Sequence, residues 1–297
     1  MEFSRRALLA ASAAAAAAPR PARAQDFPSR PVTIIAAGAA GGPTDTITRI
    51  VADSMGRHLG QPVVVEAIGP ANVATQRLTQ MRPDGHTLMI TNVGMAASAT
   101  LFRRLPYEIP GGFAPLGLVS DAAMTLVARP GFPARDLRGL LVQQAAGAQA
   151  TIVVFRGTAP AIAELMAGRI DMLCDQATNT VPYIRDGRVA AFGVSSPRRL
   201  PGLPDLPTAA EMGFPGVSMS AWHGLFAPAG TPEPVQEAIA AALRGALREE
   251  RLRTRFAELL TEPATEERAT PAFHRRFLAE EVERWRPIIQ AAGAYAD

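Results

Sequence analysis

A turn of small residues, Gly41-Gly42-Pro43-Thr44-Asp45, has the composition of an anion-binding site. It follows Pro31 to Ala36, which predicts a short buried strand, and it precedes apolar residues at helical spacing between Ile47 and Leu59. A helix that begins after such a turn leaves its first backbone N–H groups unpaired and directed out of the turn. Glycine lets an oxygen atom of a ligand approach the backbone closely. The turn therefore predicts anion binding, although a plain strand-to-helix connection has the same pattern.

Two further loops lie at the carboxyl ends of predicted strands. Asn92-Val93-Gly94-Met95-Ala96 follows the predicted strand Thr87 to Ile90, and Asp175 opens a polar loop after the predicted strand Ile170 to Leu173. The alternation of strands and helices indicates an α/β fold with right-handed crossovers and mostly parallel sheets. Because ligands of such sheets bind at the carboxyl ends of the strands, we expect the loop after Ile90 to lie beside the glycine turn.

Several other kinds of site are disfavoured by the residues present. All 30 basic residues are arginine, which excludes a P-loop lysine and a Schiff-base lysine. The 4 histidines lack metal-ligand spacing, so neither a metal nor another cofactor is expected. No G-x-S-x-G elbow occurs, and a triad of Ser195, His223 and Asp175 stays only as an alternative. The glycine turn and Glu66 follow the plan of a dinucleotide site, but the G-x-G-x-x-G fingerprint is missing.

The first residues have the pattern of a cleaved signal peptide, which we place at residues 1–24. A basic Arg5-Arg6 pair precedes an Ala-rich apolar stretch, and small residues end it at Ala22-Arg23-Ala24. Export to the periplasm by the twin-arginine or the general secretory route follows. The leader carries a net charge of +3, so removing it takes the formal charge of the chain from +3 to 0. With no dense basic run interleaved with aromatic residues, nucleic-acid binding is not expected.

Ordered motifs along the chain resemble those of the substrate-binding proteins of tripartite tricarboxylate transporters, the Bug or TctC-like family. The motifs that carry the resemblance are Phe27-Pro28-Ser29-Arg30-Pro31-Val32, the glycine turn at residues 41–45, Leu59-Gly60-Gln61-Pro62-Val63-Val64-Val65-Glu66, Pro83-Asp84-Gly85-His86-Thr87-Leu88, Leu105-Pro106-Tyr107, Phe113-Ala114-Pro115, Leu203-Pro204-Asp205-Leu206-Pro207-Thr208 and Ala227-Pro228-Ala229-Gly230-Thr231-Pro232.

The resemblance implies a two-lobed periplasmic binding protein of the type II-like architecture, with the ligand in a cleft between the lobes. One lobe would combine residues 26–104 with 222–297, and the other would span 105–221. The protein would be a monomer and not an enzyme. It would capture a small mono-, di- or tricarboxylate, or an amino-dicarboxylate, and deliver it to the permease subunits in the membrane.

The resemblance also implies the ligand-binding residues. The family's ligand turn falls on Gly41, Gly42, Pro43, Thr44 and Asp45, and its second loop falls on Asn92, Gly94, Met95 and Ala96. Its acidic loop in the other lobe falls on Asp175, and Trp222 and His223 fall where the chain returns between the lobes. Two alternatives stay open: Trp222 as a core residue, and Asp175 as a cap of the following helix.

The chain departs from the family's pattern at two places. The loop at residues 66–72 is short and lacks the usual arginine. Between Leu141 and Thr151 only residues 142–150 are present, where the family has a strand, a turn and a helix, so the second lobe is expected to lack a strand and a helix. Two alternative functions follow: a degenerate family member whose second lobe is impaired and does not transport, and an exported small-molecule enzyme.

Overall fold

The computed structural model describes residues 27–134, 151, 153, 155, 157–293, 295 and 296. The expected signal peptide at residues 1–24 and the shortened segment at residues 142–150 lie outside the described residues. Within the described part of the chain, no helix is long and apolar enough to cross a membrane.

The first half of the larger lobe is built from three strands, each followed by a helix. In chain order these elements are β1 (Val32–Ala37), α2 (Pro43–Leu59), β2 (Val63–Ile68), α3 (Ala71–Thr79), β3 (Thr87–Asn92) and α4 (Gly94–Leu101). β1 pairs in parallel with both β2 and β3, as the alternation of strands and helices predicts. α2 begins at Pro43, whose fixed φ suits the first helical position, and it ends before Gly60 in the left-handed conformation.

Two long strands cross between the lobes. They are β4 (Phe113–Ala128) and β7 (Ser220–Pro228), which pair in an antiparallel manner, and β7 also pairs with β3. The strand order is β2-β1-β3-β7-β4-β5, with β6 and β8 also paired to β4. Among the described strands, the parallel pairs are β1 with β2 and β1 with β3, and the other strand pairs are antiparallel. The sheet is therefore mixed, whereas the sequence predicted mostly parallel sheets. The apolar runs at residues 116–119 and 124–128 predict two separate strands, but in the structure both belong to the one continuous strand β4.

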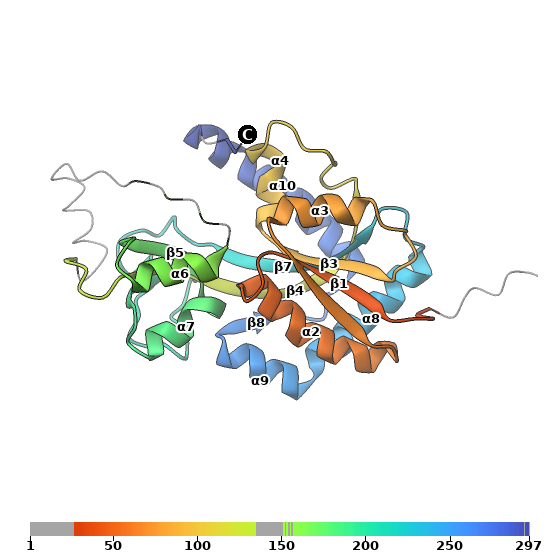
Figure 1. The fold of residues 1–297 in the computed structure, drawn as a ribbon, viewed down its shortest axis with the longest axis horizontal. Helices are drawn as coiled ribbons and strands as arrows, with labels where there is room; N and C mark the ends of the chain where they lie inside the picture. Colours follow the sequence, from red (N-terminus) through yellow and green to blue (C-terminus); the bar gives the residue numbers. More distant parts are fainter. Residues whose placement is uncertain are drawn as a thin grey trace, which may run out of the picture.

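The smaller lobe contains the carboxyl end of β4 and the elements that pack on it. These are α6 (Thr158–Met166), β5 (Met172–Gln176), α7 (Ala177–Arg185) and β6 (Ala190–Val194). Figure 1 shows α6, β5 and α7 on the left, joined to the larger lobe by β4 and β7. The core of the larger lobe includes Phe113, Leu116, Leu118 and Val119, which the sequence assigned to the other lobe from residue 105 onward. The chain changes lobe within β4, because its amino-terminal half pairs with β7 and packs into the larger core.

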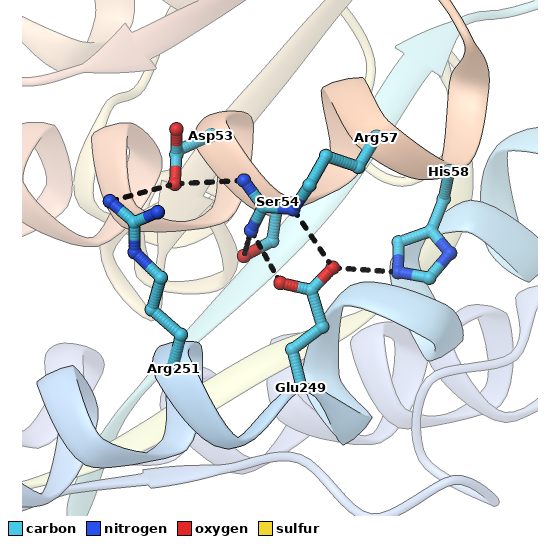
Figure 2. A network of polar contacts seen from close by, with 6 residues as sticks. All are labelled: Asp53, Ser54, Arg57, His58, Glu249 and Arg251. Atoms are coloured by element: carbon cyan, nitrogen blue, oxygen red, sulfur yellow. Dashed lines mark hydrogen bonds and ion pairs between the residues drawn. The ribbon is translucent and has the colours of Figure 1, made fainter.

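The carboxyl-terminal elements return to the larger lobe. They are α8 (Glu233–Arg248), α9 (Glu250–Glu258), β8 (Thr261–Pro263) and α10 (Pro271–Ala292). A polar network fastens the carboxyl end of α2 to the junction of α8 and α9 (Figure 2). In it, Glu249 accepts hydrogen bonds from the guanidinium of Arg57 and lies 2.9 Å from His58 Nε2, while Arg57 also donates to Asp53 at 3.1 Å. These contacts hold the far end of α2, whose first turn lies at the site described next.

Candidate functional site

A cavity of about 600 Å³ lies where the two lobes face each other. It opens at the carboxyl ends of β1, β3 and β5, the edge where the sequence placed the site. None of its lining residues within the described part of the chain carries a charge. The lining residues are Ala37, Gly38, Ala39, Gly42, Pro43, Thr44, Pro70, Ala71, Asn92, Phe155, Gly157, Thr158 and Gln176.

Four helices begin at this cavity. The residues that precede α2, α3, α6 and α7 are Gly42, Pro70, Gly157 and Gln176, and all of them line it. None of these helix starts has a side-chain cap. Each helix start carries partial positive charge and uncapped backbone N–H groups. Two of these helices belong to each lobe, so an anion between the lobes would meet positive dipole ends on both sides.

The glycine turn uses its own N–H groups to hold its shape. Gly41 donates its N–H to Asp45 Oδ2 at 2.8 Å, and Gly42 donates to the carbonyl of Ala39 at 3.0 Å. By contrast, the N–H groups of Thr44 and Asp45 have no acceptor among the described residues. The N–H groups open to a ligand therefore lie inside the first helical turn, beyond the glycines. Asp45 is buried, forms the turn and pairs with Arg49 at 2.9 Å.

Asn92 connects this turn with the start of α4. Its Oδ1 accepts the N–H of Gly94 at 2.9 Å, which directs its Nδ2 to Thr44 Oγ1 at 3.2 Å. The Thr44 oxygen thus accepts a hydrogen bond, and its own O–H proton stays available for a ligand. Thr44 and Asn92 together give the larger lobe an oriented hydroxyl donor at the cavity wall.

The smaller lobe closes the other side of the cavity with the start of α6. The backbone of Gly157 approaches Ala39 so closely that a Cβ on Gly157 would lie 2.6 Å from the Ala39 Cβ. Thr158 donates to Asp175 Oδ1 at 3.4 Å, and Asn179 donates to Asp175 Oδ2 at 3.4 Å. Asp175 is buried behind Thr158 and does not line the cavity. Burial raises the pKa of its carboxyl, and the hydrogen bonds that it accepts oppose this shift.

Some of the predicted site residues line the cavity and others do not. Gly42, Pro43, Thr44 and Asn92 line it. Those that shape its wall from behind are Gly41, Asp45, Gly94 and Asp175. The remaining predicted residues, Met95, Ala96 and Trp222, lie in the hydrophobic core.

Trp222 corrects the expectation of a cleft residue. Its side chain is only 1% exposed, and its Nε1 donates to the buried carboxylate of Glu281 at 2.8 Å. Because its N–H is paired with a buried carboxylate and its ring packs against Phe277, Trp222 is a core residue. The sequence left this role open as the alternative. Met95 and Ala96 point into the same core because they lie on the inner face of α4.

The catalytic triad suggested as an alternative has no support in the geometry. His223 Nδ1 lies 3.2 Å from Ser120 Oγ, and both residues are fully buried. Ser195 instead donates to the carbonyl of Met219 at 2.6 Å. Since Asp175 bonds to neither Ser195 nor His223, the three side chains do not form a relay. In the described part of the chain, no group of histidine, cysteine and carboxylate side chains could hold a metal ion.

The sequence did not identify the smaller lobe's share of the lining. Phe155, Gly157, Thr158 and Gln176 line the cavity, as do Pro70 and Ala71 at the start of α3. A signal was present at two places. Gly157 and Thr158 directly precede residues 159–167, whose pattern predicts a helix, and Gln176 follows the predicted site residue Asp175. The other lining residues in this group can be identified only from the tertiary structure.

The comparisons with known proteins agree with this geometry. The model of the tripartite tricarboxylate transporter family receptors (TctC) matches residues 47–146 and 139–294. The chain belongs to this receptor family. A UPF0065 protein of Agrobacterium vitis is 38% identical over 302 residues, covering 92% of this chain and 87% of that protein. The family resemblance expected from the sequence is thereby confirmed.

Solved structures of related receptors share the two-lobed fold. The periplasmic binding protein BugD has a TM-score of 0.85 and 32% identity, covering 91% of this chain and 100% of that chain. MatC of Rhodopseudomonas palustris, with bound malate, has a TM-score of 0.82 and 35% identity, covering 89% of this chain and 100% of that one. This receptor therefore has the fold of a periplasmic binding protein, and its family consists of solute-binding proteins, not enzymes.

Proposed function

We propose that this receptor binds a small carboxylate in the cavity between its lobes and delivers it to the permease subunits of a tripartite tricarboxylate-type transporter. The observation that carries the proposal is the convergence of four uncapped helix starts on an uncharged cavity. Helix dipoles contribute about 0.3–1 kcal/mol each to anion binding, and up to ~2 kcal/mol where the geometry is partly buried. The malate bound to MatC supports the same ligand class.

The ligand carboxylate would be held by neutral donors. The free N–H groups of Thr44 and Asp45 and the Thr44 hydroxyl face it from the larger lobe, and the start of α6 faces it from the smaller lobe. Hydrogen bonds to a charged group are worth about 1.5–3 kcal/mol each, so a few such donors suffice without an arginine clamp. Export to the periplasm by a signal peptide, and function as a monomer, belong to the same proposal.

The alternative of a degenerate member with an impaired second lobe has less support. The smaller lobe contributes Gly157, Thr158 and Gln176 to the cavity, and Gly157 contacts Ala39 of the larger lobe. The smaller lobe supplies four of the thirteen described lining residues, and this shared wall supports binding between the lobes.

The test uses isothermal titration of the protein with a panel of mono-, di- and tricarboxylates, and of amino-dicarboxylates. Thr44→Val keeps the size of the side chain and removes the hydroxyl, so we expect affinity for the bound acid to fall by at least about tenfold. Thr48→Val is the matched control, because Thr48 lies one turn along the same helix and is fully buried, donating to the carbonyl of Thr44. Binding of no acid in the panel, or equal affinity in Thr44→Val and the parent protein, would refute the proposal.

A further inference from the structure

A second cavity, of about 820 Å³, lies beside the strands that cross between the lobes. Among the described residues, it shares no lining residue with the cavity proposed to bind a carboxylate, hereafter the carboxylate cavity. β4 contributes Asp121 and Ala123 to its wall, and the start of β7 contributes Ser220. The smaller lobe contributes residues 196–201, which follow β6, and the larger lobe contributes Arg268 and Arg284. Its volume is in the range of roughly 300–1,000 Å³ that small-molecule sites have.

The lining of this second cavity is rich in guanidinium groups, unlike that of the carboxylate cavity. Arg198 and Arg199 come from the smaller lobe, and Arg268 and Arg284 come from the larger lobe. The carboxylates in the lining are those of Asp121 and Glu262. The lining, as far as the described residues show it, thus carries four positive and two negative side chains.

Three of these arginines have partners that use only part of their hydrogen-bonding capacity. Arg268 donates to both carboxylate oxygens of Asp121. Arg199 donates to Glu211 at 3.0 Å and to the carbonyl of Pro204 at 2.9 Å. Arg284 donates to Glu281 at 3.0 Å and to the carbonyl of Ser218 at 3.3 Å. Glu211 and Glu281 do not line the cavity, so these two carboxylates lie behind the arginines. A guanidinium has five N–H donors, and the hydrogen bonds named here engage two nitrogen atoms of each arginine, which leaves N–H donors for a further acceptor.

Arg198 differs from the other three. Its side chain is exposed and has no hydrogen bond or ion pair with any described residue. The planar fork of a guanidinium matches the oxygen atoms of phosphate and carboxylate groups. The cavity thus has one arginine without a partner among the described residues and three whose guanidinium groups retain unused N–H donors. Because these arginines come from both lobes, they suit an anion that carries several phosphate or carboxylate groups.

We propose that this second cavity binds a small polyanion bearing phosphate or carboxylate groups, which contacts Arg198 and Arg199 on the smaller lobe and Arg284 on the larger lobe. Bound there, the polyanion would bridge the lobes next to β4 and β7. The site is separate from the carboxylate cavity, so its occupancy does not depend on the function proposed above.

The test is isothermal titration of the full protein with inorganic pyrophosphate, and in a second arm with citrate, at an ionic strength of about 0.15 M to screen diffuse attraction. We expect saturable binding in at least one arm, and Arg198→Ala lowers that affinity by about tenfold or more. If only one of the two titrations depends on Arg198, it shows whether the site prefers phosphate or carboxylate groups. Arg82→Ala is the matched control, since Arg82 is also exposed, has no ion pair among the described residues and lies outside the cavity.

Three results would overturn the proposal: no saturable binding in either arm, affinities that Arg198→Ala leaves unchanged, or equal losses in Arg198→Ala and Arg82→Ala. Failure of the carboxylate proposal gives a different pattern, because Thr44→Val leaves Arg198-dependent binding of pyrophosphate intact. The exposure of Arg198 makes Arg198→Ala compatible with a normal fold, which a thermal melt of the variant confirms.

Discussion

Acidification should destabilise this protein through two histidines that are buried without charge. Burial lowers the pKa of His223 to about 4, and burial together with the positive charge of Arg268 lowers the pKa of His274 to about 3. An unfolded chain takes up these protons near the ordinary histidine pKa of 6.5. The folded state therefore binds fewer protons than the unfolded state between these values, and its stability falls as the pH falls through this range.

The size of the effect follows from the two pKa values. Each pKa unit between the folded and unfolded states corresponds to about 1.4 kcal/mol. At pH 4 each histidine thus removes about 3 kcal/mol of unfolding free energy, against a total of about 5–15 kcal/mol for a typical protein. Asp175 has the opposite effect on the pH dependence of stability. Burial raises the pKa of its carboxyl, so the ionised carboxylate destabilises the folded state, and this destabilisation disappears as the pH falls through the pKa of Asp175 in the folded state.

The assay is urea unfolding at pH 7, 5.5 and 4, followed by circular dichroism. His223→Gln replaces the imidazole with a neutral amide, so we expect the loss of unfolding free energy between pH 7 and 4 to shrink by about 3 kcal/mol in this variant. The measurement at pH 7 is the internal control for the cost of the substitution itself. Equal losses in His223→Gln and the parent protein would refute the reasoning, because His223 would then not be a buried neutral histidine.

Two further predictions concern packing and surface charge. Gly224→Ala should lower the unfolding free energy by about 1–3 kcal/mol, because its Cβ would lie 2.5 Å from the buried ring of His274; an unchanged urea midpoint would contradict this contact. Glu249→Gln weakens the network with Arg57 in Figure 2, so we expect a small drop in melting temperature that shrinks as salt is raised. A drop that is independent of salt would show that this network does not act through charge.

Short-range sequence patterns predicted the strands and helices at the start of the larger lobe. β1, β2 and β3 are short apolar runs between turns, and the glycine turn lies directly between β1 and α2, so both the strands and the first wall of the site follow from short stretches of sequence. The sequence predicted two strands within β4, and polar Ser120 and Asp121 lie between the two apolar runs. In the structure both residues pair with β7, and that long-range pairing makes the strand continuous.

The other wall of the site depends on which helix starts face each other across the lobes. Thr158 and Gln176 each lie at an ordinary helix start, and only the tertiary arrangement brings them opposite Thr44. The resemblance placed Trp222 near the cleft because the chain returns between the lobes at this residue. The pleat of β7 decides which face of the sheet its side chain takes, and here that face is the core.

Two acidic residues lie beside a cavity proposed to hold an anion, and the structure accounts for both. Asp45 accepts the N–H of Gly41 and pairs with Arg49, so its charge is largely compensated before a ligand arrives. Asp175 is buried and burial raises the pKa of its carboxyl, and it lies behind the lining residues Thr158 and Gln176. The two carboxylates thus shape the walls while the groups that face the ligand stay neutral. A cavity of this kind selects an anion by directed N–H and O–H groups more than by net charge, because its described lining carries none.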